Sequence, residues 1–271
     1  MKKSVTVYLA FILVLTACFG GKKDRISIKG STTILPIVQK AAEQFRKSNT
    51  AVISIEGNGS ENGITALFES SCDIAMSSYH ISPQKFQEAA EKGLKLRELI
   101  IAYDMIIPVV NPANTVDNLT KEQLKNIYGG KISSWKELGW VDAEIMIISR
   151  DSFSGTLTVW NEKVMSGQAI AAAAFIEDSN KRVVNTVSDN LHAIGYIACA
   201  YLNNRLKPVK IENIAADVKN AYSGEYPLTR ELFIYFNEGS ISKKAEKFAF
   251  FLITDEGQQC AVKAGYIPLK V

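Results

Sequence analysis

Short apolar segments alternate with amphipathic helical segments along most of this 271-residue chain, and this alternation limits the folds open to it. Residues 25–28, 52–56 and 73–76 have the composition of buried strands, and a helical pattern follows each of them. In the first such pattern, residues 34–45 carry apolar side chains at intervals of three and four. Repeated strand-then-helix units predict a mainly parallel sheet with helices on both faces, and therefore an α/β fold.

The later part of the chain continues the alternation. The apolar residues 100–110 predict a buried strand, and Thr120 with Gln123 matches a capping box before a helix. Residues 145–149 predict another strand ahead of a further helix, and four alanines at 171–174 predict a short helical run. A chain of this length suits two modest domains or one large α/β unit.

The composition excludes several classes of protein. With 47% apolar residues and a net charge of +3, the chain is neither disordered nor strongly basic, so nucleic acid is not an expected partner. Only two histidines occur, His80 and His192, and Cys72, Cys199 and Cys260 lack metal-ligand spacing. We therefore expect no metal and no cofactor. Buried free thiols are favoured, although one disulfide is compatible with the sequence.

The N-terminal residues predict a secretory leader. Two lysines precede an apolar run at residues 5–16, which is shorter than the roughly 20 residues that a membrane-spanning helix needs. Leu-Thr-Ala then precedes Cys18, which resembles the bacterial lipoprotein box, whose cysteine is lipidated. We expect a signal peptide at 1–17 and a lipidated, palmitate-bearing tether at 18–25. The alternative is an ordinary signal peptide with a cysteine there by chance.

Three strand-to-helix junctions, at residues 30–33, 57–60 and 150–156, carry clusters of Ser, Thr and Gly. A helix N-terminus presents unpaired N–H groups and partial positive charge, hydroxyl groups add donors, and glycine permits close approach. In an open α/β sheet, ligands lie beyond the carboxyl ends of the strands. Each cluster alone is more often a plain helix cap, and Arg150 alone a solvated charge. Their coincidence, with Arg150 four residues before Ser154, favours an anion site.

The same segments, in the same order, resemble the phosphate-binding proteins of bacterial phosphate ABC transporters, the PstS family. The matching pieces cover essentially the whole mature chain, and they are residues 28–36, 57–64, 73–78, 111–135, 150–156, 226–230 and 257–268. The resemblance implies the two-lobe periplasmic-binding-protein fold of type II, with a ligand cleft that closes by hinge motion.

The expected lobes follow from that resemblance. Two crossing hinge strands are expected near residues 105–110 and 232–236. Lobe one would then comprise residues 26–106 plus 234–271, and lobe two residues 107–233.

The resemblance also implies a function and a set of binding residues. The chain would be an extracytoplasmic, membrane-anchored receptor that binds inorganic phosphate between its lobes and delivers it to the permease subunits of an ABC transporter. It would be a monomer without catalytic residues, held to membrane lipid through Cys18. The residues that match the family's phosphate ligands are Ser31, Thr32, Thr33, Ser60, Ser78, Arg150, Ser154, Gly155 and Thr156.

Around Ser78 the sequence departs from the family pattern. The best-known long members have an Asp there that accepts the phosphate proton, and many short members read Ser-Ser-Arg, whereas this chain reads Ser77-Ser78-Tyr79. Hydroxyl groups accept as well as donate, so they would have to accept the proton here. We therefore expect phosphate to bind preferentially and sulfate to compete at high excess.

Three other classes of protein remain open. The first is an enzyme such as a serine hydrolase or a phosphatase, but Ser60 lies in Gly-Asn-Gly-Ser-Glu rather than in the nucleophile elbow G-x-S-x-G. The second is a related receptor for sulfate, molybdate or another oxyanion. The third is a surface protein that binds a macromolecule, for which the sequence offers no specific feature.

Overall fold

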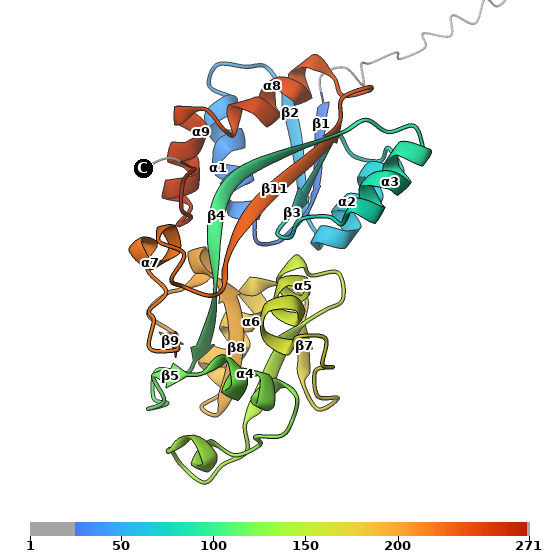
Figure 1. Ribbon diagram of the computed structural model, residues 1–271. Coiled ribbons are helices and arrows are strands. Elements are labelled where there is room, and N and C mark those ends of the chain that lie inside the picture. Colours follow the sequence, from blue (N-terminus) through green and yellow to red (C-terminus); the bar gives the residue numbers. More distant parts are fainter. Residues whose placement is uncertain (1–24, 270–271) are drawn as a thin grey trace, which may run out of the picture.

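Two long neighbouring strands, β4 (Leu96–Val110) and β11 (Thr229–Asn237), form the centre of the computed structural model, which describes residues 25–269 (Figure 1). The strands pair antiparallel, with Met105 opposite Thr229. From Ile106 onward, β4 changes partner and pairs with β8 (Ala193–Ala198). One sheet path therefore joins the two halves of the molecule, in the order β2-β1-β3-β11-β4-β8-β6-β7.

The upper group of elements in Figure 1 is built from both ends of the described chain. Its strands β1 and β2 are parallel, as are β1 and β3, which fulfils the expectation of parallel strand-then-helix units. Its elements are β1 (Arg25–Gly30), α1 (Leu35–Phe45), β2 (Val52–Gly57), α2 (Ser60–Phe68), β3 (Ile74–Ser77), α3 (Pro83–Glu91), α8 (Lys243–Phe251) and α9 (Asp255–Lys263).

Alternate side chains of the upper strands pack on opposite faces of the sheet. Met76 and Ile234 belong to the apolar cluster under α1, α8 and α9, whereas Ala75 and Tyr235 belong to the cluster that continues under α2. This period of two buries both faces of the strands, because helices cover both sides.

The lower group contains the middle of the chain (Figure 1). Here β6 is parallel to both β7 and β8. Its helices and main strands are α4 (Lys121–Tyr128), β6 (Met146–Arg150), α5 (Gly155–Trp160), β7 (Phe175–Glu177) and α6 (Asn180–Asp189). Shorter elements are β5 (Asn118–Leu119), β9 (Lys207–Pro208), β10 (Lys210–Ile211) and α7 (Val218–Tyr222), with short helical turns at Trp135–Leu138, Asn161–Met165 and Cys199–Tyr201.

Most of the expected elements are present, including the capping box in which the Thr120 hydroxyl accepts from the Gln123 N–H. The helical run expected at residues 171–174 is wrong. The Ala171 N–H donates to the Tyr128 carbonyl at 2.8 Å and the Ala174 N–H to the Ala171 carbonyl at 3.0 Å, so this segment is a turn into β7. Alanine favours a helix, but contact with α4 decides the conformation here.

The lobe boundaries expected after residues 106 and 233 stay a prediction, since strand pairing alone describes one continuous sheet path. The leader and Cys18 lie outside the described residues. Within residues 25–269, none of the helices has the length and apolar character needed to cross a membrane. Cys72, Cys199 and Cys260 are free thiols, and burial raises the pKa of each.

Candidate anion-binding site

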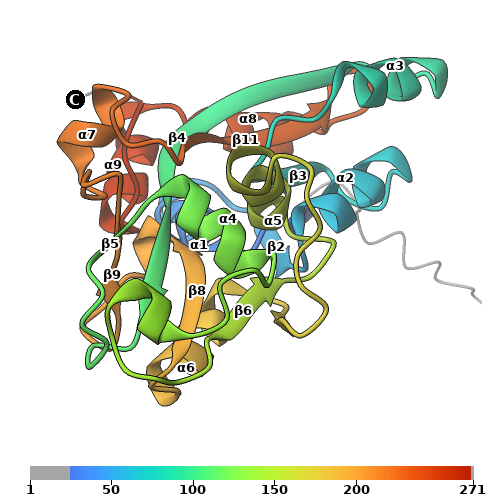
Figure 2. The same ribbon diagram turned by 60° about the horizontal axis from the view of Figure 1, so that its bottom comes forward.

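All nine residues expected to bind the anion line one narrow space, which is too tight to hold a water molecule, and Gly59 is the one further residue in its wall. The space lies between the two groups of elements, because β1, α2 and β3 supply one part of the wall and β6 and α5 supply the other. In both views of the fold, α5 lies beside α2 and β3 (Figures 1 and 2). Every hydroxyl-bearing residue of the set is buried.

The loop after β1 presents Ser31, Thr32 and Thr33. Gly30 allows this loop to turn, since it has φ of +131° and a Cβ there would lie 2.3 Å from the Met76 carbonyl oxygen. The Ser31 hydroxyl accepts the Thr33 N–H at 3.2 Å, which holds the three residues in one compact turn before α1.

The second junction places Ser60 at the start of α2, next to Ser78. The Ser60 hydroxyl accepts the Ser78 N–H at 3.2 Å and lies 3.4 Å from the Ser78 hydroxyl. Gly59 precedes the helix with φ of +102°, and no side chain caps the helix end. The hydroxyls of Ser60 and Ser78 therefore lie at one wall of the space, beside the start of α2.

The third junction brings α5 against the upper group. The Ser154 hydroxyl accepts the Leu157 N–H at 3.3 Å, so Ser154 caps the helix and also lines the space. A Cβ on Gly155 would lie 2.4 Å from the Ser60 hydroxyl oxygen and 2.7 Å from that of Ser78. Glycine at this position is therefore what lets the two groups meet.

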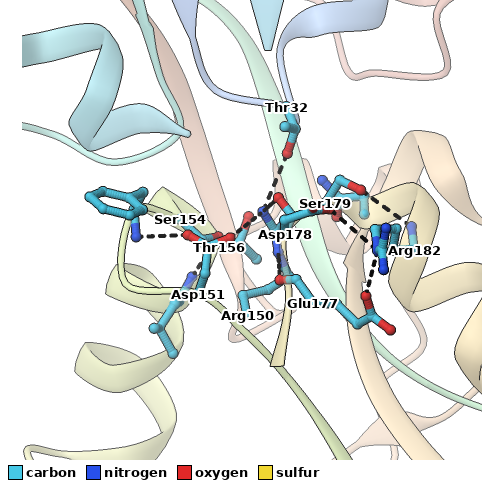
Figure 3. Close-up of polar contacts among 12 residues, drawn as sticks. Thr32, Arg150, Asp151, Ser154, Thr156, Glu177, Asp178, Ser179 and Arg182 are labelled. Atoms are coloured by element: carbon cyan, nitrogen blue, oxygen red, sulfur yellow. Dashed lines mark hydrogen bonds and ion pairs between the residues drawn. The ribbon is translucent and has the colours of Figure 1, made fainter. Parts of the chain in front are cut away.

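Arg150 ends β6 and points toward Thr32, with Thr156 nearby (Figure 3). Its Nε donates to the Glu177 carbonyl at 3.0 Å, and its Nη2 donates to the Asp178 carbonyl at 2.9 Å and to the Thr32 hydroxyl at 3.4 Å. The Nη1 atom is buried without a partner. Burial lowers the pKa of Arg150, but guanidinium remains protonated in proteins.

Aromatic packing in the lower group fixes the position of Arg150. The rings of Trp160 and Tyr196 stack with centroids 4.2 Å apart, which contributes about 0.5–1.5 kcal/mol beyond burial. The Tyr196 hydroxyl accepts the Arg150 N–H at 3.2 Å and contacts the Ser149 hydroxyl at 3.0 Å. The core of the lower group therefore positions the end of β6, where the arginine side chain begins.

A buried ion pair that was not expected from the sequence lies beside the site. Arg230 at the start of β11 binds Asp104 of β4, with Nη2 2.7 Å and Nε 2.9 Å from Oδ2. Arg230 also donates to the hydroxyls of Thr156, at 3.1 Å, and Thr33, at 3.4 Å. A signal for the pair was present, because a lone carboxylate in the apolar run 100–110 is expected to have a buried cationic partner.

Three further residues, which were not candidates from the sequence, support the turn at Thr32 and Thr33. The Tyr201 hydroxyl donates to the Thr32 carbonyl at 2.7 Å, and the Tyr266 hydroxyl donates to the Thr33 carbonyl. The side-chain amide of Asn180 donates to the Thr33 hydroxyl at 3.1 Å. Nothing in the spacing of these residues indicates this role, since they come from distant parts of the chain.

The histidines contact other residues. His80 lies 3.2 Å from Glu98, and the His192 ring packs against Trp140. Within residues 25–269, no group of three or more His, Cys, Asp or Glu side chains could hold a metal ion. The arrangement that the described residues do form is a set of hydroxyl and guanidinium donors around one narrow space, and donors of these kinds bind the oxygens of an anion.

The chain is similar in sequence to a known protein family and to named members of it. Residues 19–256 match a family model described as a PBP superfamily domain. The phosphate-binding protein PstS of Staphylococcus saprophyticus is 33% identical, over 97% of this chain and 88% of that protein. The PstS of Bacillus subtilis is 30% identical, over 99% of this chain and 95% of that protein.

Solved structures resemble the chain as well. A phosphate ABC transporter substrate-binding protein from Clostridium perfringens, solved with bound phosphate, has a TM-score of 0.86 and 32% identity, covering 91% of this chain and 100% of that one. A phosphate transport receptor from Vibrio cholerae has a TM-score of 0.74 and 29% identity, covering 89% of this chain and 99% of that one.

Proposed function

Since this chain belongs to the PBP superfamily and, within it, to the PstS family of phosphate-binding proteins, we propose that it is an extracytoplasmic receptor for inorganic phosphate that serves an ABC transporter. It acts by binding and release and is not an enzyme. Similar proteins bear the name phosphate-binding protein, and one was solved with phosphate bound.

The observation that carries this proposal is the gathering of all nine expected residues around one space, among them Arg150, whose Nη1 is buried without a partner. A buried donor without a partner costs about 1–3 kcal/mol, and more when the group is charged. An anion oxygen would accept from Nη1 and recover that free energy. Serine and threonine hydroxyls would then bind the remaining oxygens.

The charge of the site also favours an anion. Arg230 is neutralised by Asp104 at 2.7 Å, whereas the nearest carboxylate to Arg150 is Asp151, at 3.9 Å. The main partners of Arg150 are carbonyl groups, which leave its positive charge in place. The site therefore carries an excess positive charge in a buried setting, where an anion is attracted strongly.

The carboxylates nearest the site are engaged with other partners. Asp104 binds Arg230, and Asp151 accepts the Phe153 N–H at 2.8 Å. Neither carboxylate lines the space, so we expect a hydroxyl group to accept the phosphate proton. This supports a receptor that prefers phosphate but binds sulfate measurably at high excess.

The remaining partners follow from the same family. We place lobe one at 26–106 plus 234–271 and lobe two at 107–233, with phosphate bridging them and the permease subunits receiving the closed form. Lipidation of Cys18, outside the described residues, would hold the monomer on the outer face of the cell membrane. A single lipid chain anchors weakly, so further acylation or basic residues would be needed for stable attachment.

Two measurements test the proposal. The first identifies the anion that co-purifies with the folded protein, and the second titrates stripped protein calorimetrically with phosphate, sulfate and molybdate near pH 7. We expect phosphate to bind tightest by a wide margin. Equal affinity for sulfate would contradict the assignment and favour a general oxyanion receptor, while turnover of a chromogenic phosphate ester would favour an enzyme.

A further inference from the structure

Arg230 lies behind the anion site and donates to two of its threonines. Its Nη2 carries two hydrogens, of which one binds Asp104 Oδ2 at 2.7 Å. The other faces the hydroxyl oxygens of Thr156, at 3.1 Å, and Thr33, at 3.4 Å. A guanidinium group has no acceptor, so both threonine oxygens must accept from it.

Asn180 donates to the same region from the start of α6. It is fully buried, and its Oδ1 accepts the Ala198 N–H at 3.0 Å, which fixes the orientation of the amide. The Nδ2 group therefore faces the Thr33 hydroxyl oxygen, 3.1 Å away, and donates to it.

These donors fix the direction of the hydrogen bond between the two threonines. Thr33 Oγ1 has two lone pairs, and Asn180 and Arg230 occupy both of them. In the 3.2 Å contact between Thr33 and Thr156, the hydrogen must therefore come from Thr33. Thr156 Oγ1 then accepts from Thr33 and Arg230, so its own hydrogen is left to point into the space that both threonines line.

We propose that Asn180 and Arg230 are positioning residues that act through Thr33 to fix Thr156 as a hydrogen-bond donor to the bound anion. We call the path Asn180–Thr33–Thr156 the donor relay. The inference rests on the proposed function, because it concerns the same site.

The donor relay has a consequence for specificity. A donor-only Thr156 binds an unprotonated oxygen, which phosphate and sulfate both offer, so it does not accept the phosphate proton. Discrimination must then come from hydroxyls whose direction is free, such as Ser60 and Ser78, which lie 3.4 Å apart with either atom able to donate. Releasing the donor relay would let Thr156 accept as well, and would favour phosphate over sulfate.

Calorimetric titration of single and double variants tests the donor relay. Thr156→Val removes the final donor and should weaken phosphate and sulfate alike by about 10- to 100-fold, the range for a hydrogen bond to a charged group. Thr33→Val and Asn180→Ala should each weaken the binding of sulfate about 3- to 10-fold, and the binding of phosphate less. The reason is that each leaves the hydrogen bond from Thr156 to the anion imperfectly directed rather than absent. Neither should have a further effect in a Thr156→Val background.

Conservative variants separate this role from general destabilisation. Thr33→Ser keeps the hydroxyl and should recover most of the sulfate affinity that Thr33→Val loses. The matched control is Thr158→Val, which should bind both anions normally. The native Thr158 hydroxyl lies on the same helix as Thr156 and donates to the Ser154 carbonyl at 3.3 Å. If Asn180→Ala fails to fold, the pairing of Thr33→Val with Thr156→Val carries the test by itself.

The outcomes distinguish this inference from the proposed function. Native protein that binds neither phosphate nor sulfate would overturn the proposed function, and the donor relay with it. Native binding, together with Thr33→Val losses that persist in the Thr156→Val background, would overturn the donor relay alone, because Thr33 would then contact the anion directly.

Discussion

At the scale of single residues, the two buried arginines of the site have different roles because their counter-charges differ. Arg230 is paired with Asp104, whose Oδ2 accepts from both Nε and Nη2 of the arginine, whereas Arg150 is held by the carbonyls of Glu177 and Asp178. Carbonyl groups fix the direction of a guanidinium but do not neutralise it. Arg150 is therefore the residue whose charge remains for a ligand, and Arg230 is the one that orients neighbouring groups.

Replacing Arg150 should abolish most of the binding. Arg150→Ala removes a charged donor and should cost at least ~2 kcal/mol of phosphate binding, since hydrogen bonds to charged groups contribute about 1.5–3 kcal/mol. Titration calorimetry on the folded variant measures this loss. Arg182→Ala is the matched control, because Arg182 lies in α6 with an exposed side chain that pairs with Glu177 at 2.9 Å. Unchanged affinity in a folded Arg150→Ala protein would remove this residue from the site.

A methyl group on Gly155 should prevent the two groups of elements from meeting. The added Cβ would lie 2.4 Å from the Ser60 hydroxyl oxygen, which is too close for any contact without movement. We expect Gly155→Ala to fold with near-native stability but to bind phosphate at least tenfold more weakly, about 1.4 kcal/mol. Gly239→Ala, where the nearest atom would be 3.3 Å away in a surface turn, is the control. Native affinity in Gly155→Ala would show that close approach at this point is not needed.

At the scale of elements, the strand-to-helix junctions serve both the fold and the site. Ser154 caps α5 and lines the space, and Gly59 begins α2 without a side-chain cap. By contrast, the Thr120–Gln123 capping box begins α4, which contributes nothing to the wall of the space. Helix capping and anion binding can therefore be separated by experiment.

Thr120→Ala should lower stability without changing binding. Loss of an N-cap hydroxyl costs about 1 kcal/mol of the free energy of unfolding, because the Gln123 N–H loses its acceptor. Urea denaturation measures the loss, and calorimetry checks that phosphate affinity is unchanged. A variant that loses affinity in proportion to its stability would show that α4 is coupled to the site.

The sequence predicted the elements whose signals are local, and it missed the contacts that form only in the folded chain. Periodicity located α1, and the capping box located α4. The expected anion ligands meet at one place because parallel strands end at a common edge. Residues 171–174 were assigned wrongly, since the contact with Tyr128 in α4 outweighs the helix propensity of alanine. Asn180 could not be found from spacing, because its partner Thr33 is 147 positions away.

At the scale of the whole molecule, the two groups of elements are joined by β4 and β11 and touch again across the site. Hydrogen bonds connect them there, among them Thr33 to Thr156 at 3.2 Å, Arg150 to Thr32 at 3.4 Å and Asn180 to Thr33 at 3.1 Å. The Tyr201 hydroxyl also donates to the Thr32 carbonyl at 2.7 Å, and the Glu61 N–H donates to the Phe153 carbonyl at 3.2 Å. β4 changes partner between Met105 and Ile106, and the Ile106 N–H donates to the Leu228 carbonyl at 3.0 Å. A bend at this point would change the separation of the two groups across the site.

Phosphate should therefore make the protein more compact and more stable. The hydrogen bonds across the site are worth only about 0.5–1.5 kcal/mol each in net terms, because water replaces them when the groups separate. An anion held by both groups favours the closed form by its differential affinity. At a phosphate concentration 100 times the dissociation constant, mass action adds about 2.7 kcal/mol to the free energy of unfolding. Small-angle scattering should show a smaller radius of gyration with phosphate, and thermal melting a higher Tm.

Gly155→Ala separates closure from binding in this experiment. Saturated with phosphate, it should compact less than the native protein, because its methyl group stands between Ser60 and Ser78 in the closed form. Arg150→Ala should keep the radius of gyration of the phosphate-free protein when phosphate is below the dissociation constant of this variant. Little anion is then bound to bridge the two groups. An identical radius for the native protein with and without phosphate, with binding confirmed by calorimetry, would mean that the crossing strands act as a rigid connection and that the site admits its ligand without hinge motion.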